Sequence, residues 1–97
     1  MSAFMISRIT VRDPARFKEY LQASKKIASK YGAELILNGG YNYNITDDQA
    51  DHELVVAARF PDAESIRRWH ESDEYQAIVA LREAGSEQHI DIYESLI

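Results

Sequence analysis

Apolar and polar side chains alternate over residues 3–11, and this period of two predicts a β-strand with two different faces. One face would carry Phe4, Ile6, Arg8 and Thr10, and the other Met5, Ser7, Ile9 and Val11. Because both sets include large apolar residues, we expect this strand to be covered on both sides.

Apolar residues then recur every three or four positions, which predicts a helix over residues 14–31. Asp13 is a favoured N-cap, and Pro14 suits the first helical position. Gly32 fits the left-handed backbone that ends many helices. The expected buried stripe consists of Phe17, Tyr20, Leu21, Ser24, Ile27, Ala28 and Tyr31.

Residues 33–37 and 41–45 both have a strand-like composition, and an Asn-Gly-Gly sequence at 38–40 separates them. Asn-Gly favours a hairpin turn, but a turn here would leave strands of unsuitable length on both sides. We therefore predict one long strand with a glycine bulge or bend. A polar, acidic loop follows over residues 46–52, and residues 53–60 form a third strand antiparallel to the second.

Two capping residues mark the next helical region. Asp62 is an N-cap, and Ser72 has the features of a second N-cap further along the same region. We predict a helix that begins after Asp62, breaks or kinks at Ser72 and ends at Gly85. Its inward-facing side chains are expected to be Ala63, Ile66 and Trp69 or His70, followed by Tyr75, Ile78, Val79 and Leu81.

The last strand is expected over residues 88–95. Its two faces carry Ile90 with Ile92, and His89 with Asp91 and Tyr93. The order is thus strand–helix–strand twice, the double split βαβ pattern of a ferredoxin-like α+β sandwich. In this βαββαβ fold, helices cover one face of a four-stranded antiparallel sheet. The 97 residues correspond in length to one domain, residues 1–97.

The sheet predicted in this way has two apolar faces. The strand at 53–60 has apolar residues on both faces: Leu54, Val56, Ala58 and Phe60 on one, and Val55 and Ala57 on the other. Helices cover one face of the sheet, and a second copy of the sheet is the simplest cover for the other. We expect a homodimer that packs sheet to sheet.

The net charge of −5 argues against nucleic-acid binding, which usually requires a basic surface. The adjacent Arg67 and Arg68 are flanked by Glu64 and Glu71, as on a solvated helix face. The chain has no cysteine and no metal or phosphate motif, so we expect neither a metal nor a cofactor. No apolar run approaches the roughly 20 residues that span a bilayer, and no signal peptide is evident. We expect a cytoplasmic protein with no membrane partner.

Polar residues on otherwise apolar strands are the candidates for catalysis. His89 and Asp91 share one strand face, about 7 Å apart. With Arg59 they form our candidate catalytic group, because histidine titrates near neutral pH and a cation stabilises a developing anion. The alternative for His89 and Asp91 is a structural polar row. Arg8 and Arg59 would hold a substrate carboxylate or enolate, or else form ion pairs.

Six tyrosines and one tryptophan suggest an aromatic pocket. Such a pocket would suit a planar, aromatic or polyketide-like small molecule. The candidate substrate-binding residues are Arg8, Tyr20, Trp69, His70 and Tyr75. The alternative is that the aromatic residues only line the core, and that His70 faces solvent or caps the helix.

Several motifs together resemble a known family. They are Tyr31-Gly32, Asn38-Gly39-Gly40, Arg59-Phe60-Pro61, Trp69, Ser72-Asp73-Glu74-Tyr75-Gln76 and Leu81-Arg82. From Phe4 to about Glu94 the chain resembles the uncharacterised bacterial family called domain of unknown function thirteen-thirty. That resemblance implies the dimeric α/β-barrel superfamily, with the fold and sheet-to-sheet dimer predicted above, but no activity. The acidic segment Asp47-Asp48-Gln49-Ala50-Asp51 looks individual to this chain.

The superfamily implied by the resemblance includes cofactor-free monooxygenases, isomerases and haem-handling enzymes. Haem-degrading members have a histidine ligand where this chain has Val79 and an asparagine where it has Ser7, so haem degradation is disfavoured. Two main functions stay open: a cofactor-independent enzyme acting on a small hydrophobic or aromatic molecule, or a non-catalytic dimeric ligand-binding or accessory domain. A third possibility is a subunit that only docks to a larger enzyme, which would show a further exposed apolar patch beyond the dimer face.

Overall fold

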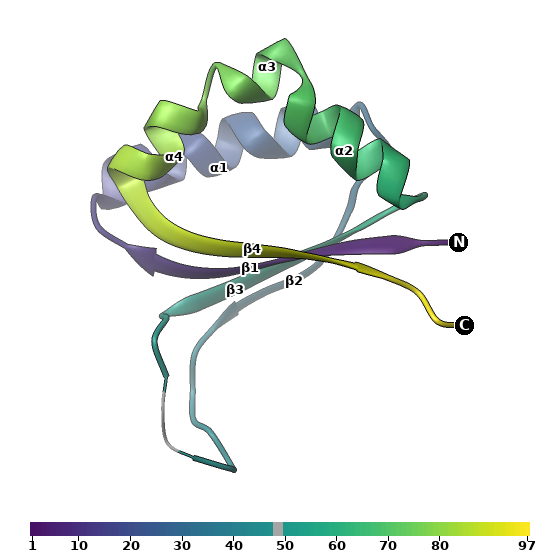
Figure 1. The fold of residues 1–97 in the computed structure, drawn as a ribbon. Coiled ribbons are helices and arrows are strands. Elements are labelled where there is room, and N and C mark those ends of the chain that lie inside the picture. The colour runs from purple at the N-terminus through teal and green to yellow at the C-terminus, as the bar shows by residue number, and fades with distance from the viewer. Residues whose placement is uncertain (48–49) are drawn as a thin grey trace.

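Strands and helices follow one another in the predicted order. The computed structural model describes residues 1–47 and 50–97. Its elements are β1 (Ala3–Val11), α1 (Pro14–Ser29), β2 (Glu34–Gly40), β3 (Leu54–Phe60), α2 (Ala63–Glu71), α3 (Asp73–Gln76), α4 (Val79–Gly85) and β4 (Ser86–Glu94). Figure 1 shows the strands as one antiparallel sheet, in the order β2-β3-β1-β4, with all these helices on one face. The predicted α+β ferredoxin-like fold is confirmed.

The helices α1, α2 and α3 begin at the residues predicted to cap them. Asp13 accepts a hydrogen bond from a backbone N–H three residues later at 3.3 Å, and Asp62 does the same at 2.7 Å. Ser72 ends α2 and caps α3, where its hydroxyl accepts from the backbone N–H of Tyr75 at 3.2 Å. The predicted break at Ser72 is therefore confirmed, and its cause is this second cap.

The strand register separates the sheet into a helix-facing side and an outer side. Met5 lies opposite Ala58 and Ile92, so these positions share the face toward the helices. The outer face carries Phe4, Ile6, Arg8, Leu37, Val55, Ala57, Arg59, His89, Asp91 and Tyr93. The face assignments made from alternation for β1 and β4 are correct.

Three aromatic rings form the centre of the core between helices and sheet. The Trp69 ring packs on Tyr75, with ring centroids 4.3 Å apart, and on Phe60, at 5.7 Å. None of the three is more than 2% exposed. Trp69 precedes the break at Ser72 and Tyr75 follows it, so the break allows both rings to enter the same core.

Two glycines permit close packing around α1. A Cβ at Gly85 would lie 2.6 Å from the backbone nitrogen of Phe17, so only glycine lets α4 approach the start of α1. Gly32 has a φ of 83°, the left-handed conformation predicted for the end of the first helix, and a Cβ there would lie 2.8 Å from Pro61.

The prediction of one long second strand is wrong. β2 ends at Gly40, and residues 41–45 are not part of a strand. The irregularity in pairing lies between Leu35 and Leu37, not at the glycines. β2 ends here because its partner β3 begins at Leu54, opposite Gly40. Within the predicted acidic loop, Asp48 and Gln49 lie outside the described residues.

Candidate functional site

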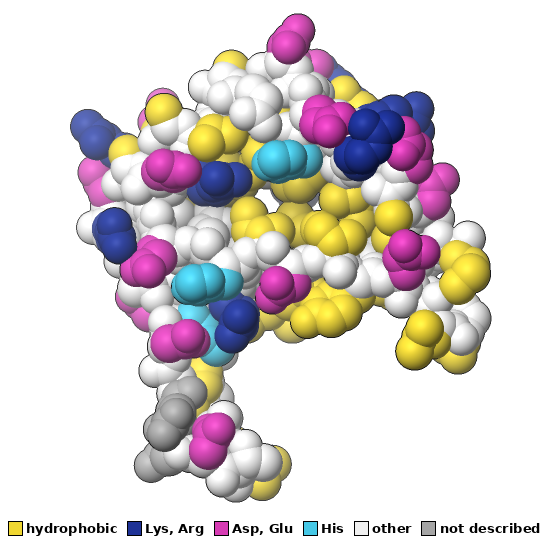
Figure 2. Space-filling view, viewed as in Figure 1, with side chains coloured by type: hydrophobic (Ala, Val, Ile, Leu, Met, Phe, Trp, Pro, Cys, Tyr) yellow, Lys and Arg dark blue, Asp and Glu magenta, His cyan; other side chains and the backbone are white. Residues whose placement is uncertain are grey.

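A cavity of about 470 Å³ lies between the helices and the edge strand β4. Its walls are formed by Ala63, Ile66, Arg67, Trp69 and His70 of α2, Arg82 of α4, and Gln88, Ile90 and Ile92 of β4. Figure 2 shows hydrophobic side chains exposed in a hollow between the helical layer and the sheet. We call this space the β4 cavity.

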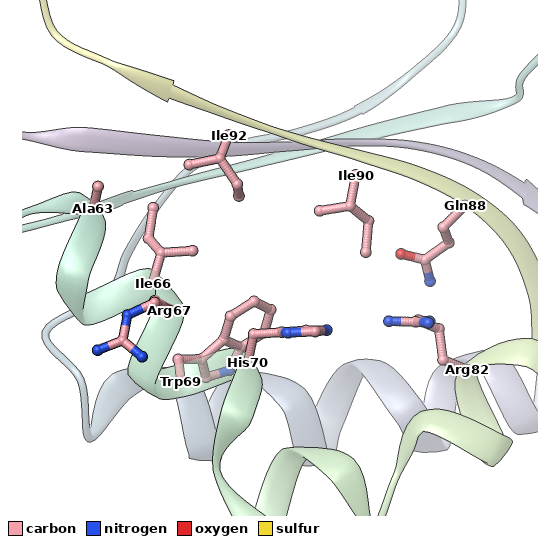
Figure 3. A pocket seen from close by; sticks show the side chains of 9 residues that line it. All are labelled: Ala63, Ile66, Arg67, Trp69, His70, Arg82, Gln88, Ile90 and Ile92. Atoms are coloured by element: carbon pink, nitrogen blue, oxygen red, sulfur yellow. The ribbon is translucent and has the colours of Figure 1, made fainter.

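The polar side chains that line the β4 cavity lie mainly at one end, except Arg67, which lies beside Ile66 and pairs with Glu64 and Glu71. Figure 3 shows the side chains of His70, Arg82 and Gln88 gathered at one end, with Ile66 and Ile92 toward the opposite end. These polar residues come from three different elements, α2, α4 and β4. The break at Ser72 separates α2 from α4, so that His70 and Arg82 face the same space from different helices.

Arg82 is held by a tyrosine pair beneath the cavity. Its Nη1 donates to the Tyr75 hydroxyl at 2.9 Å, and the Tyr75 and Tyr20 hydroxyls lie 2.8 Å apart. Burial alone lowers the pKa of the Arg82 guanidinium, but the hydrogen bond to Tyr75 and nearby charges outweigh burial and raise its pKa. Burial raises the pKa of the Tyr20 hydroxyl far above its usual range, and Tyr75 raises it further. At neutral pH the site therefore has the Arg82 cation near the neutral phenol of Tyr20.

Gln88 and His70 differ in how firmly they are held. The Gln88 amide accepts a hydrogen bond from Ser7 Oγ at 2.9 Å and donates one to Ser86 Oγ at 2.9 Å. The imidazole of His70 lies beside the Tyr75 ring, with centroids 5.6 Å apart, and makes no hydrogen bond within residues 1–47 and 50–97. Both ring nitrogens of His70 are thus available to a ligand.

Trp69 lies between the β4 cavity and a second, smaller cavity. The second cavity, of about 240 Å³, lies between α1 and the β2–β3 half of the sheet. The indole Nε1–H of Trp69 is buried and has no hydrogen-bond partner among the described residues. An unsatisfied buried donor costs about 1–3 kcal/mol, so this N–H lowers the stability of the core.

The structure divides the residues proposed from the sequence between opposite faces of the sheet. Tyr20, Trp69, His70 and Tyr75 lie on the helix side, where Trp69 and His70 line the β4 cavity. Arg8, Arg59, His89 and Asp91 lie on the outer face. The two groups do not form a single site within one chain.

Ion pairs occupy the outer-face arginines. Arg59 Nη2 lies 2.5 Å from Glu34 Oε2, and Arg8 Nη2 lies 3.7 Å from Asp91 Oδ2. His89 is the strand neighbour of Arg8. The side chains in both pairs are between 44% and 61% exposed, so each pair is open to solvent in the single chain.

Sequence reasoning missed Arg82 and Gln88 as candidate site residues. Gln88 shares a strand face with Ile90 and Ile92. A polar residue in this otherwise apolar, helix-facing row was the sequence feature that could have identified it. Arg82 follows Tyr75 by seven positions, which would place both residues on one face of a continuous helix. The break between α3 and α4 means that this spacing alone does not predict their contact.

The described residues contain neither a metal-binding cluster nor a membrane-spanning helix. Across residues 1–47 and 50–97, no group of three or more His, Asp or Glu side chains is arranged to hold a metal ion. In the same part of the chain, no helix is long and apolar enough to cross a membrane.

Three solved structures illustrate the similarity of this fold to known proteins. RPA0582, a protein of unknown function from Rhodopseudomonas palustris, aligns with a TM-score of 0.84 at 14% identity, over 99% of this chain and 83% of its own. A dimeric ferredoxin-like protein of unknown function from Jannaschia sp. CCS1 has a TM-score of 0.76 at 10% identity, over 98% and 100%. SnoaB, a cofactor-independent oxygenase from Streptomyces nogalater, has a TM-score of 0.72 at 14% identity, over 99% and 94%.

These identities show a shared fold and nothing more. A comparison with curated proteins finds no match. The family model described as "Domain of unknown function (DUF1330)" matches residues 2–96, which is almost the whole chain. The protein therefore belongs to the DUF1330 family.

Proposed function

We propose that this chain is the subunit of a homodimeric, cofactor-independent enzyme that acts on a small planar molecule in the β4 cavity. The molecule would be largely apolar, with an oxygen-bearing end that is anionic or becomes anionic. The observation that carries this proposal is the arrangement of the cavity, which has apolar walls and the cluster of His70, Arg82 and Gln88 at one end.

The size and lining of the cavity support such a ligand. Its volume of about 470 Å³ lies within the ~300–1,000 Å³ typical of small-molecule sites. Ile66, Ile90 and Trp69 give the cavity an apolar lining. Arg82 donates to the Tyr75 hydroxyl at 2.9 Å and lies 3.5 Å from the exposed carboxylate of Glu83, so a ligand oxygen would compete with Glu83 for the guanidinium.

The same groups support proton abstraction. A histidine whose ring nitrogens are free is a suitable general base near neutral pH. His70 would take a proton from an acidic C–H next to a carbonyl, and the electron pair would move onto the carbonyl oxygen. Arg82 would stabilise the resulting enolate. That SnoaB, on the same fold, is a cofactor-independent oxygenase supports chemistry of this kind without a cofactor.

Binding is tested with 2-naphthoate, a planar aromatic carboxylate, by calorimetry and by quenching of the single tryptophan. Loss of the cation in Arg82→Gln is expected to weaken binding ~10- to 100-fold, the range of a charge-assisted hydrogen bond. Arg82→Lys, which keeps the charge, should recover part of that loss. Arg12→Gln is the control, because Arg12 is exposed and pairs with Glu87 outside the cavity. Equal affinity in wild type and Arg82→Gln would contradict the proposed site.

Catalysis is tested with 2-tetralone, an aromatic ketone with acidic C–H bonds. In D₂O the protein should accelerate deuterium exchange at the carbon between the ring and the carbonyl, measured by NMR, and His70→Gln should remove the acceleration. Binding of 2-naphthoate should survive in His70→Gln, because the cavity and Arg82 are unchanged.

The second candidate is a non-catalytic ligand-binding domain. The observation that favours it is that no side chain in the described residues orients the His70 imidazole, whereas catalytic bases are usually held by a further group. Binding of 2-naphthoate without any acceleration of exchange would favour this function over the enzyme. Absence of binding would exclude both.

The sheet-to-sheet homodimer is supported by the outer face of the sheet. Phe4, Ile6 and Val55 lie there, and no element of the described chain covers them. Proteins of this fold from Jannaschia sp. and Bacteroides fragilis are described as dimeric. Light scattering should give twice the chain mass of 11.1 kDa, and Ile6→Lys should give monomers.

The outer-face residues are proposed as a weaker alternative site. Catalysis by Arg59, His89 and Asp91, with Arg8 holding the substrate, requires a molecule bound between the two sheets. His89→Gln is the matched test, since it should leave 2-tetralone exchange unchanged if the β4 cavity is the site.

A further inference from the structure

The connection between β2 and β3 stands away from the rest of the molecule. Figure 1 shows it projecting from the sheet on the side opposite the helices, and Figure 2 shows the same projection beyond the surface of the body. We call its described residues, 41–47 and 50–53, the arm. The arm therefore points into the space in front of the outer face of the sheet.

The base of the arm is anchored to the sheet. The backbone N–H of Tyr41 donates to Glu53 O at 2.7 Å, and the N–H of Glu53 donates to Ile9 O at 2.8 Å. The Tyr41 ring also packs edge-on against His52, with centroids 5.7 Å apart. These contacts fix the direction in which the arm leaves the body.

The outer part of the arm carries large apolar side chains with no cover. Tyr43 is 73% exposed and Ile45 is 87% exposed. Between them, the Asn44 side chain accepts from the backbone N–H of Thr46 at 2.6 Å and shapes the local turn. Exposed apolar side chains of this size on a projecting segment indicate a contact surface.

We infer that the arm of each protomer packs against the edge of the partner's sheet, with Tyr43 and Ile45 as the anchoring side chains. This inference rests on the proposed sheet-to-sheet dimer. In such a dimer the partner's sheet lies ~10 Å in front of the outer face. Five residues, 41–45, can span at most about 16 Å, so the arm is long enough to reach the partner's sheet.

One edge of the sheet offers a matching surface. The edge strand β2 carries half-exposed apolar side chains, Ile36 and Leu37, each 48% exposed. The arm projects on the same side as the uncovered outer face of the sheet. A second copy that packs on this face is therefore the partner that the arm would contact. Each symmetric dimer would contain two such contacts.

The first test is the double variant Tyr43→Ser/Ile45→Ser, examined by sedimentation equilibrium. Since two apolar side chains are exposed in each of two arms, we expect the dimer dissociation constant to rise ~100-fold or more. Asn42→Ser, an exposed polar change on the same arm, is the matched control and should leave the constant unchanged. A double variant that dimerises as tightly as wild type overturns the inference.

The second test uses the absence of cysteine from the chain, which makes a single label at Ile45→Cys site-specific. An environment-sensitive dye there should shift its emission to the blue as the protein concentration rises through the dissociation constant. Adding Ile6→Lys should keep the emission solvent-like at every concentration. If the wild type is a dimer and the dye stays solvent-like, or is equally shielded in the Ile6→Lys background, only the arm contact fails. If the wild type is a monomer, the proposed dimer fails and the arm contact with it.

Discussion

Arg82 and Arg59 show how differently the helix side and the outer face of the sheet hold a positive charge. Arg59 Nη2 is 2.5 Å from Glu34, and its side chain is 47% exposed. The Arg82 side chain is 19% exposed and donates to the neutral hydroxyl of Tyr75. The charge of Arg59 is therefore balanced by a close carboxylate on the same sheet, whereas Arg82 is held by a phenol and its nearest carboxylate, the exposed Glu83, is 3.5 Å away. Position on an apolar element does not by itself identify a binding arginine.

The largest expected effect contrasts a buried tyrosine with an exposed one. Tyr75 is fully buried, whereas Tyr93 on the outer face is 54% exposed. Tyr75→Ala should lower the free energy of unfolding by about 3–5 kcal/mol, as for large aromatic residues in a core. Tyr93→Ala, measured by urea denaturation in the monomeric Ile6→Lys background, should cost less than about 1 kcal/mol. Similar losses for both variants would contradict the difference between the two faces.

A smaller effect isolates the Tyr75 hydroxyl, which connects Tyr20 to Arg82. Tyr75→Phe keeps the ring but leaves the Tyr20 hydroxyl and Arg82 Nη1 without this partner. We expect a loss of about 2 kcal/mol in the free energy of unfolding, the cost of unsatisfied buried polar groups. The affinity for 2-naphthoate should fall as well, because Arg82 is no longer fixed. An unchanged affinity would show that Tyr75 does not position Arg82.

Tyr20 makes the helix side sensitive to alkaline pH. Burial, with Tyr75 adjacent, raises the pKa of Tyr20 in the folded state. The unfolded chain therefore loses this proton first, at its ordinary pKa of about 10. The contribution to stability is fully present below that pH and is lost as the pH rises, by about 1 kcal/mol per unit. Urea denaturation between about pH 9 and 11 should show a weaker decline in Tyr20→Phe than in wild type.

Much of the fold could be predicted because its signals are local. The cap at Asp62 and the second cap at Ser72 act within one helical turn, and alternation along β1 separates its two faces without knowledge of any partner. The end of β2 was not predicted, because it depends on where β3 begins, at Leu54. Strand composition at 41–45 says nothing about whether a pairing partner is within reach.

The candidate site was only half predictable for the same reason. Trp69 and His70 stand out in the sequence, and both line the β4 cavity. Arg59 also stands out, but its partner Glu34 is 25 positions away, so the ion pair depends on a register that the sequence does not reveal. Arg82 looks ordinary in the sequence, and its importance arises from Tyr75 and from the wall of a cavity that only the fold creates.

The smallest expected effect tests whether the Arg59–Glu34 pair contributes to stability. A double-mutant cycle of Arg59→Gln and Glu34→Gln, made in the monomeric Ile6→Lys background, should give a coupling of about 0.5 kcal/mol. The coupling is small because both side chains are about half exposed and water screens the pair. In the proposed dimer of the wild type the same cycle should give a larger value, since the partner's sheet would remove water from the pair. A monomer coupling above about 2 kcal/mol would mean that Arg59 is held as strongly as Arg82, and the contrast between the two faces would fail.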